Sequence, residues 1–122
     1  MLQWSSCLFA TVVMHAYYKR CVAYHHVFLW LTVSSLLFHC QPDPVRVVRV
    51  IDKSLAHLAY VLVMFDTPRA VAGNATWLLL FPLTAGCAWF SQSFWPDRSK
   101  QLHLALHTVG VCGMHVYLWV LY

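Results

Sequence analysis

Long apolar stretches, separated by short polar segments, dominate the hydrophobic pattern of this chain. A helix that crosses a bilayer needs roughly 20 mostly apolar residues. Five stretches approach that length, and their ends can be placed to within a few residues. They cover about 2–18, 21–41, 47–65, 71–92 and 102–122. The pattern therefore predicts an all-α integral membrane protein, a bundle of about five transmembrane helices.

The segments between these stretches contain residues that end helices. Lys19 and Arg20 follow the first stretch, and prolines beside charged residues follow the next three, at 42–44, 66–69 and 96–98. Proline removes a backbone donor and clashes with the preceding turn of a helix. Pro82 falls inside the fourth stretch, where a membrane helix tolerates a kink. We predict that residues 1–122 form a single transmembrane helical domain.

Composition and charge support a multi-pass membrane protein. Apolar residues make up 61% of the chain and charged residues only 10%, against about 25% charged in soluble domains. The formal net charge is +4, but basic residues never form a run of five, so no nucleic-acid partner is indicated. Five scattered cysteines without a C-x-x-C pair predict no disulfide framework. Residues 1–18 lack the basic start and cleavage site of a signal peptide, and we interpret them as the first membrane helix.

Three polar signals interrupt the apolar stretches: Ser35 with His39, then Asp52, then His103 with His107. Ionisable groups are costly inside a membrane and usually mark a functional site. His39 ends the second stretch and Asp52 begins the third, so both lie near one membrane face. The chain then crosses twice and begins its fifth stretch at His103 on that same face. The pattern therefore predicts that all five side chains reach one leaflet at similar depth.

This set of side chains suits a zinc ion. His103 and His107 are four residues apart, which places them on one face of a helix, and His39 supplies a third nitrogen. Three imidazoles leave a fourth position for water, the pattern of catalytic zinc, and zinc lowers the pKa of such water towards about 7. Asp52 could orient that water or accept its proton, and Ser35 could donate a hydrogen bond to a substrate carbonyl.

Each signal taken alone has an ordinary structural explanation. An H-x-x-x-H pair is common in packed helices, a helical serine often bonds to a carbonyl of its own helix, and Asp52 could pair with Arg49 or Lys53. The three signals in one order and at one depth favour the metal site.

The same residues carry a resemblance to a known superfamily. Residues 33–39 (VSSLLFH) and 46–54 (RVVRVIDKS) resemble the second-to-third helix region of hemolysin III proteins, and 103–107 (HLALH) resembles their last helix. Hemolysin III is grouped with the progestin and adiponectin receptors and the alkaline ceramidases, as membrane hydrolases. The resemblance covers roughly residues 25–65 and 98–120 of the chain. The remainder matches only as apolar stretches.

The resemblance implies a zinc ion held by His39, His103 and His107, with Ser35 and Asp52 beside it. It also implies hydrolysis of a lipid amide, as in ceramide, although several members act mainly as receptors. The family usually has seven membrane helices, whereas this chain has room for five. Removing two preserves the direction of the last helix, but leaves the bundle open on one side. A homodimer or a bound membrane lipid could fill that opening.

Three functions follow as hypotheses. The first is a zinc-dependent membrane hydrolase that acts on an amide (carbon–nitrogen) or ester bond of a lipid. The second is a non-catalytic or receptor-like membrane protein with a structural zinc. The third is a haem-binding membrane protein with two axial histidines, which would leave Ser35 and Asp52 without a role.

Overall fold

The computed structural model describes residues 2–122, and these residues form helices and short connections without a β-strand. In chain order the helices are α1 (Leu2–Cys7), α2 (Phe9–Tyr18), α3 (Val22–Cys40), α4 (Arg46–Phe65), α5 (Thr67–Ala72), η1 (Thr76–Leu79), α6 (Leu80–Phe94), η2 (Pro96–Arg98) and α7 (Ser99–Leu121). The two η elements are short 3-10 helices. The predicted all-α fold is therefore confirmed.

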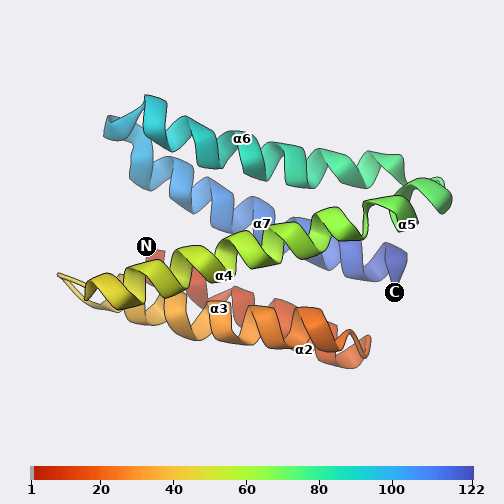
Figure 1. The fold of residues 1–122 in the computed structure, drawn as a ribbon, viewed down its shortest axis with the longest axis horizontal. Helices are drawn as coiled ribbons and strands as arrows, with labels where there is room; N and C mark the ends of the chain where they lie inside the picture. Colours follow the sequence, from red (N-terminus) through yellow and green to blue (C-terminus); the bar gives the residue numbers. More distant parts are fainter. Residues whose placement is uncertain (1) are drawn as a thin grey trace.

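Five helical rods lie along the long axis of the molecule (Figure 1). α1 and α2 make the first rod, α3, α4 and α7 make one each, and α6 extended by η1 makes the remaining one. α6 packs along α7, and α3 packs against both α2 and α4. α4 and α6 touch very little. The side of the bundle between α4 and α6 is consequently open.

The apolar core lies among α2, α3 and α7. Val12 of α2 and Leu118 of α7 have no exposed surface, and Met114 is only 1% exposed. Phe28 of α3 and Val63 of α4 extend the same cluster. This core joins the first, second and last rods, so the ends of α3 and α7 that carry the predicted ligands have fixed relative positions.

The turn between α2 and α3 requires an unusual backbone conformation at Arg20, whose φ is 57°. The amide of Cys21 donates to the carbonyl of Ala16 at 2.9 Å, and that of Arg20 donates to Tyr17 at 3.0 Å. This pair of bonds is the Schellman arrangement, which ends a helix with one left-handed residue. Glycine or asparagine usually occupies that position, so Arg20 carries a local strain.

A second turn of this kind lies inside the stretch predicted as the fourth helix, so the observed helix is shorter than predicted. Asn74 has a φ of 56°, and the amide of Ala75 donates to Ala70 at 2.8 Å. Asparagine tolerates this conformation well, so the chain turns inside the predicted stretch 71–92. The long helix begins only at Leu80, and Pro82 falls in its first turn. An amide there has no carbonyl to bond to within the helix, so the proline is accommodated without breaking it.

One helix meets the length and hydropathy of a membrane span. Within residues 2–122, the segment Pro96–Leu121 is the one long and apolar enough to cross a membrane, with 26 residues and a window of mean hydropathy 1.6. Leu8 divides the first rod into helices of six and ten residues, and α6 has 15 residues. α3 carries three histidines, and α4 has charged residues in its first half. On length and composition alone, therefore, one of the five predicted crossings is supported.

Hydrogen bonds tie α3, α4 and α7 together where α4 ends. Asp66 accepts hydrogen bonds from the hydroxyls of Tyr24 and Tyr122, both at 2.6 Å. The hydroxyl of Tyr117 donates to the backbone carbonyl of Val63 at 3.3 Å. The C-terminal end of α4 is thereby fixed to the beginning of α3 and the end of α7.

Candidate metal centre

Three histidines from two helices meet at the other end of the bundle. His39 lies in the last turn of α3, and His103 and His107 lie in the first half of α7. One ring nitrogen from each lies within 4.8 Å of the other two. The ring centroids of His39 are 5.2 Å from His103 and 5.6 Å from His107, and those of His103 and His107 are 4.7 Å apart. The three predicted ligands therefore form one cluster that could hold a metal ion, called here the metal centre.

The spacing of these nitrogens is close to that of a bound ion. Tetrahedral zinc with Zn–N distances of about 2.0 Å places its nitrogens about 3.3 Å apart. A cluster with separations up to 4.8 Å is slightly wider. Rotation of the imidazole rings about their χ angles, without a backbone shift, closes a difference of this size.

Unpartnered ring nitrogens point to a missing ligand at the metal centre. The Nε2 atoms of His39 and His103 are buried, and neither has a hydrogen-bond partner among the described residues. A buried polar nitrogen without a partner costs free energy. Binding of one ion by both nitrogens would remove that cost, so the donor atoms present fit a metal.

The Nδ1 atoms of the two α7 histidines are held by other side chains. The Nδ1–H of His103 donates to Oε1 of Gln92 on α6 at 3.3 Å, and Nδ1 of His107 lies 2.8 Å from the hydroxyl oxygen of Ser5 on α1. Ser5 and His107 are both buried. Metal-binding histidines usually donate their second N–H to such a partner, which fixes the tautomer and the ring orientation. In both rings Nε2 is the nitrogen that these bonds do not use.

Asp52 is held by a residue that sequence reasoning did not single out. The Asp52 side chain is 8% exposed, and its Oδ1 accepts a hydrogen bond from the hydroxyl of Ser34 at 3.1 Å. Asp52 lies on the buried face of α4, directed towards α3, whereas neighbouring Lys53 is exposed. Within residues 2–122, neither Arg49 nor Lys53 forms an ion pair with the Asp52 carboxylate at salt-bridge distance, although Lys53 is its neighbour in the chain.

Ser35 is engaged with the first rod. Its side chain is 1% exposed, and its hydroxyl oxygen lies 2.8 Å from that of Ser6. α1 thus supplies neighbouring serines, Ser5 and Ser6, to His107 and to Ser35 respectively. Two neighbouring serines in an otherwise apolar stretch were the available signal in the sequence for this contact. Their partners became visible only with the packing of α1 against α3 and α7.

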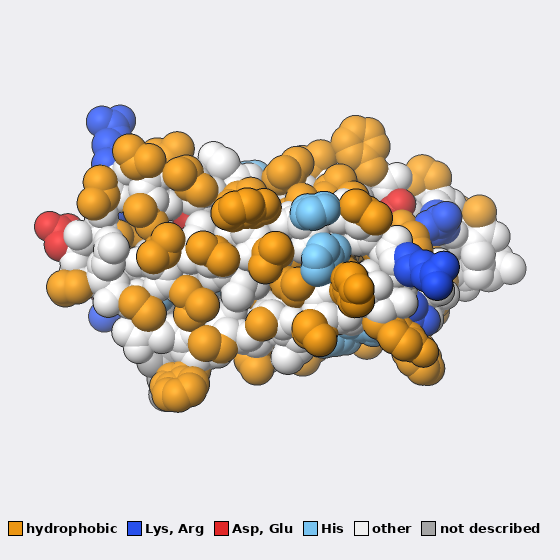
Figure 2. Space-filling model, turned by 90° about the horizontal axis from the view of Figure 1, so that it is seen from below, with side chains coloured by type: hydrophobic (Ala, Val, Ile, Leu, Met, Phe, Trp, Pro, Cys, Tyr) orange, Lys and Arg blue, Asp and Glu red, His pale blue; other side chains and the backbone are white. Residues whose placement is uncertain are grey.

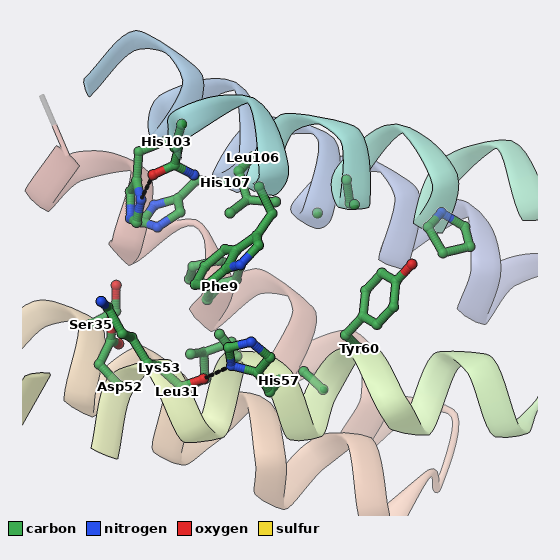
Figure 3. A pocket seen from close by; sticks show the side chains of 18 of the residues that line it. Phe9, Leu31, Ser35, Asp52, Lys53, His57, Tyr60, His103, Leu106 and His107 are labelled. Carbon is green, nitrogen blue, oxygen red and sulfur yellow. Dashed lines mark hydrogen bonds between the residues drawn. The ribbon is translucent and has the colours of Figure 1, made fainter. Parts of the chain in front are cut away.

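A large, mostly apolar cavity of about 800 Å³ lies beside the metal centre. His39, His103 and His107 line it together with Ser35 and Asp52. Figure 3 shows His103 and His107 on one side of the cavity, with Ser35 and Asp52 across from them on α3 and α4. All five residues predicted from the sequence therefore face one space.

The rest of the cavity is lined by apolar and aromatic side chains, among them Leu31, Phe81, Trp89 and Met114. It extends along the open side of the bundle between α4 and α6, where Figure 3 shows Tyr60 far from His103 and His107. The volume lies in the range of about 300–1,000 Å³ that small-molecule sites occupy. One polar end and a long apolar remainder suit an amphiphilic molecule.

Comparisons with known proteins add nothing to the assignment of a function, which therefore rests on the residues described above. No protein-family model, no curated protein and no solved structure matches the chain.

Proposed function

We propose that the protein is a zinc-dependent membrane hydrolase that cleaves an amide or ester bond of a lipid. The observation that carries the proposal is the metal centre, with two buried Nε2 atoms that lack partners at the polar end of an apolar cavity. Its resemblance to the superfamily of hemolysin III and the alkaline ceramidases rests on these same side chains and supports the same reaction class.

The donor set favours zinc over other metals. Imidazole nitrogens suit zinc among the common biological cations, whereas magnesium and calcium prefer oxygen. Three histidines are the protein ligands of one class of catalytic zinc site. When bound, zinc would supply a Lewis acid for the carbonyl and a water of lowered pKa.

The chain's own residues supply the remaining roles. Asp52, oriented by Ser34, offers a carboxylate that can accept a proton at the polar end of a mostly apolar cavity. Ser35 lines the same space and can share its hydroxyl proton with a substrate carbonyl once Ser6 donates to it. The apolar remainder of the cavity would hold the lipid chain and position its polar bond beside the histidines.

Surface composition supports a membrane location. Side chains such as Trp4, Tyr18, Phe65, Phe94 and Trp119 are each more than 70% exposed. Figure 2 shows hydrophobic side chains over the middle of the molecule, while Lys and Arg gather towards its two ends. Extended exposed apolar surface marks a membrane or an interface. Only 28% of the apolar window in Pro96–Leu121 is buried, unlike the core helix of a soluble protein.

Metal analysis and turnover test the proposal together. The protein purified in detergent should contain one zinc per chain, and the double variant His39→Ala/His103→Ala should lose it. His26→Ala is the matched control, because His26 is an exposed α3 histidine outside the cavity. Fluorescent ceramide and a matched ester should be hydrolysed, and Asp52→Asn should lower kcat by roughly 100-fold or more while keeping zinc. Normal zinc content in the double variant would end the proposal.

A structural zinc site in a non-catalytic or receptor-like protein is the second candidate. It is favoured by one observation: the hydroxyl of Ser35 and the carboxylate of Asp52 are both already bonded, to Ser6 and Ser34. Zinc retained without turnover of any lipid would select it.

A haem is less suitable, because its two axial ligands lie on opposite faces of a macrocycle, whereas three nitrogens within 4.8 Å suit one small ion. A Soret band in the purified protein would reverse that ranking.

A further inference from the structure

The polar end of the cavity carries more positive than negative charge. Its charged lining residues are Asp52, Lys53 and Lys100. Asp52 is buried and bonded to Ser34. Lys53 and Lys100 are exposed. The backbone carbonyl of Lys53 accepts a hydrogen bond from Nδ1 of His57 at 2.6 Å, but neither ammonium group forms a hydrogen bond or ion pair within the described range 2–122. Two unpaired ammonium groups thus border a space that holds one carboxylate.

Both lysines lie close to the metal centre. Lys100 is three residues before His103 in α7, so the two side chains share a face of that helix. The charge of Lys53 is near enough to interact with both His103 and Asp52. Figure 3 shows the Lys53 side chain extending along the cavity wall on the side that holds Ser35 and Asp52, across from His103.

We propose that Lys53 and Lys100 bind an anionic head group, a carboxylate or a phosphate, of the amphiphile that occupies the cavity. The inference rests on the proposed function and specifies its substrate class. The preferred substrate is then an acyl compound with a negative charge a few bonds from the scissile carbonyl, such as an N-acyl amino acid, which should bind more tightly than a neutral ceramide that the same site also hydrolyses.

Charge balance is the physical reason. A zinc ion would add two positive charges to the two ammonium groups, against the single carboxylate of Asp52. The two ammonium groups are exposed, so each attracts an anion only moderately and in a salt-dependent way, but their positive charges act together on a head group held at this end of the cavity. An ammonium–carboxylate or ammonium–phosphate hydrogen bond is also stronger than one to a neutral head group. An anionic ligand therefore gains free energy here that a neutral ligand of the same shape does not.

Equilibrium binding to the full, zinc-loaded protein in neutral detergent tests this. The probes share an oleoyl chain: N-oleoylglycine carries a carboxylate, oleoyl lysophosphatidic acid carries a phosphate, and N-oleoylglycinamide is the neutral isostere of the first. We expect at least one anionic probe to bind roughly fivefold tighter than the neutral one. The preference should weaken as salt is raised, because salt screens exposed charges. The head group that shows the preference identifies the anion.

Variants assign the preference to the lysines. Lys53→Gln/Lys100→Gln should lose most of the preference for the anionic probes, while Lys53→Arg should keep it. Lys19→Gln is the control, since Lys19 is a lysine outside the cavity, beside Trp119 at the opposite end of α7. Equal binding of charged and neutral probes by the wild type would overturn the proposal. So would an undiminished preference in the double variant, because the metal alone would then account for it.

The result is separable from the hydrolase proposal. Selective anion binding without turnover would leave the lysine site standing and remove the enzyme. If the protein binds neutral and anionic amides with equal affinity and hydrolyses both, the enzyme stands and the lysine site is removed. Zinc content and helical circular dichroism of each variant show that it is folded. If the double variant does not fold, Lys53→Gln alone must still reduce the preference.

Discussion

Ser5 and Gln92 determine which nitrogen of their histidine is left to bind a metal. Each contacts an Nδ1 atom, so that Nε2 is the nitrogen of His107 and His103 that these bonds leave for a metal ion. Neither residue belongs to the pattern that identified the histidines. They act by restricting the tautomer and the rotation of the imidazole ring, and their loss should weaken metal binding without removing a ligand.

Substituting Ser5 tests this at the scale of one hydroxyl. Ser5→Ala should weaken zinc binding by roughly 10- to 100-fold, the usual effect of removing a partner of a metal-bound histidine. Competition with a chromophoric chelator measures the affinity. Ser54→Ala is the matched control, because Ser54 is an exposed serine of α4. Unchanged affinity in Ser5→Ala would mean that His107 does not need this partner.

At this scale the sequence predicted the three histidines that cluster in the structure, but not the partners of their rings. The spacing of His103 and His107 and the position of His39 followed from helix periodicity and chain direction. Ser34, Ser5 and Gln92 could not be predicted in the same way. Their roles depend on the rotation of each helix about its axis and on side-chain packing, which periodicity does not determine.

The packing of α6 against α7 depends on a glycine. A Cβ atom at Gly113 would lie 2.2 Å from Phe81 on α6, whereas one at Gly110 would meet only Phe9, at 3.9 Å. The first distance is a severe overlap with the base of an aromatic ring, and the second is ordinary contact. The two glycines lie on the same helix and make a matched pair.

Gly113→Ala should therefore destabilise the protein by about 1–3 kcal/mol, because Phe81 must move. Gly110→Ala should be neutral or stabilise by up to about 1 kcal/mol, because alanine loses less backbone entropy in a helix. The midpoint of thermal unfolding in detergent, followed by circular dichroism, measures both changes. Similar midpoints for the two variants would contradict this account of α6 and α7.

Helix ends were predictable where proline or charge interrupted the apolar pattern. α3 and α4 match their predicted stretches closely, at Val22–Cys40 and Arg46–Phe65. The fourth stretch was predicted wrongly, because Asn74 adopts a left-handed conformation inside an otherwise apolar run. Hydrophobicity alone does not reveal such a turn. The neighbouring Gly73 and Asn74 were the available signal, since these two residue types are frequent at helix ends.

The bonds at the C-terminal end of α4 give a second prediction for an element. Asp66→Ala would leave the hydroxyls of Tyr24 and Tyr122 without their carboxylate and should cost about 2 kcal/mol. Asp97→Ala, at an exposed carboxylate in η2, should cost much less. Thermal unfolding compares the two. Zinc content should be normal in both variants, since Asp66 lies at the end of α4 remote from the metal centre.

For the whole molecule, the proposed membrane location makes cysteines informative. Cys40, Cys87 and Cys112 are all exposed in the structure. Cys40 ends α3, whereas Cys112 lies in the middle of α7. In a membrane, lipid should cover Cys87 and Cys112, and Cys40 should remain accessible to water.

Single-cysteine variants in sealed vesicles test this with a membrane-impermeant maleimide. Cys40 should react from one side of the membrane, while Cys87 and Cys112 should react only after denaturation in detergent. Vesicles of both orientations are needed, and the side from which Cys40 reacts also reports the side of the metal centre. Rapid labelling of Cys87 and Cys112 in intact vesicles would contradict the embedded bundle.

The attachments of α4 have a mechanical consequence for entry into the cavity. One part of this helix is fixed through Asp52 to Ser34, and its far end is fixed through Asp66 to two tyrosines. Between these points it packs against α3, while its contacts with α6 are few and include the ring of His57 on Trp89. A helix fastened in this way cannot swing aside like a hinged door. A guest molecule would therefore enter sideways through the existing gap between α4 and α6, tail and head together.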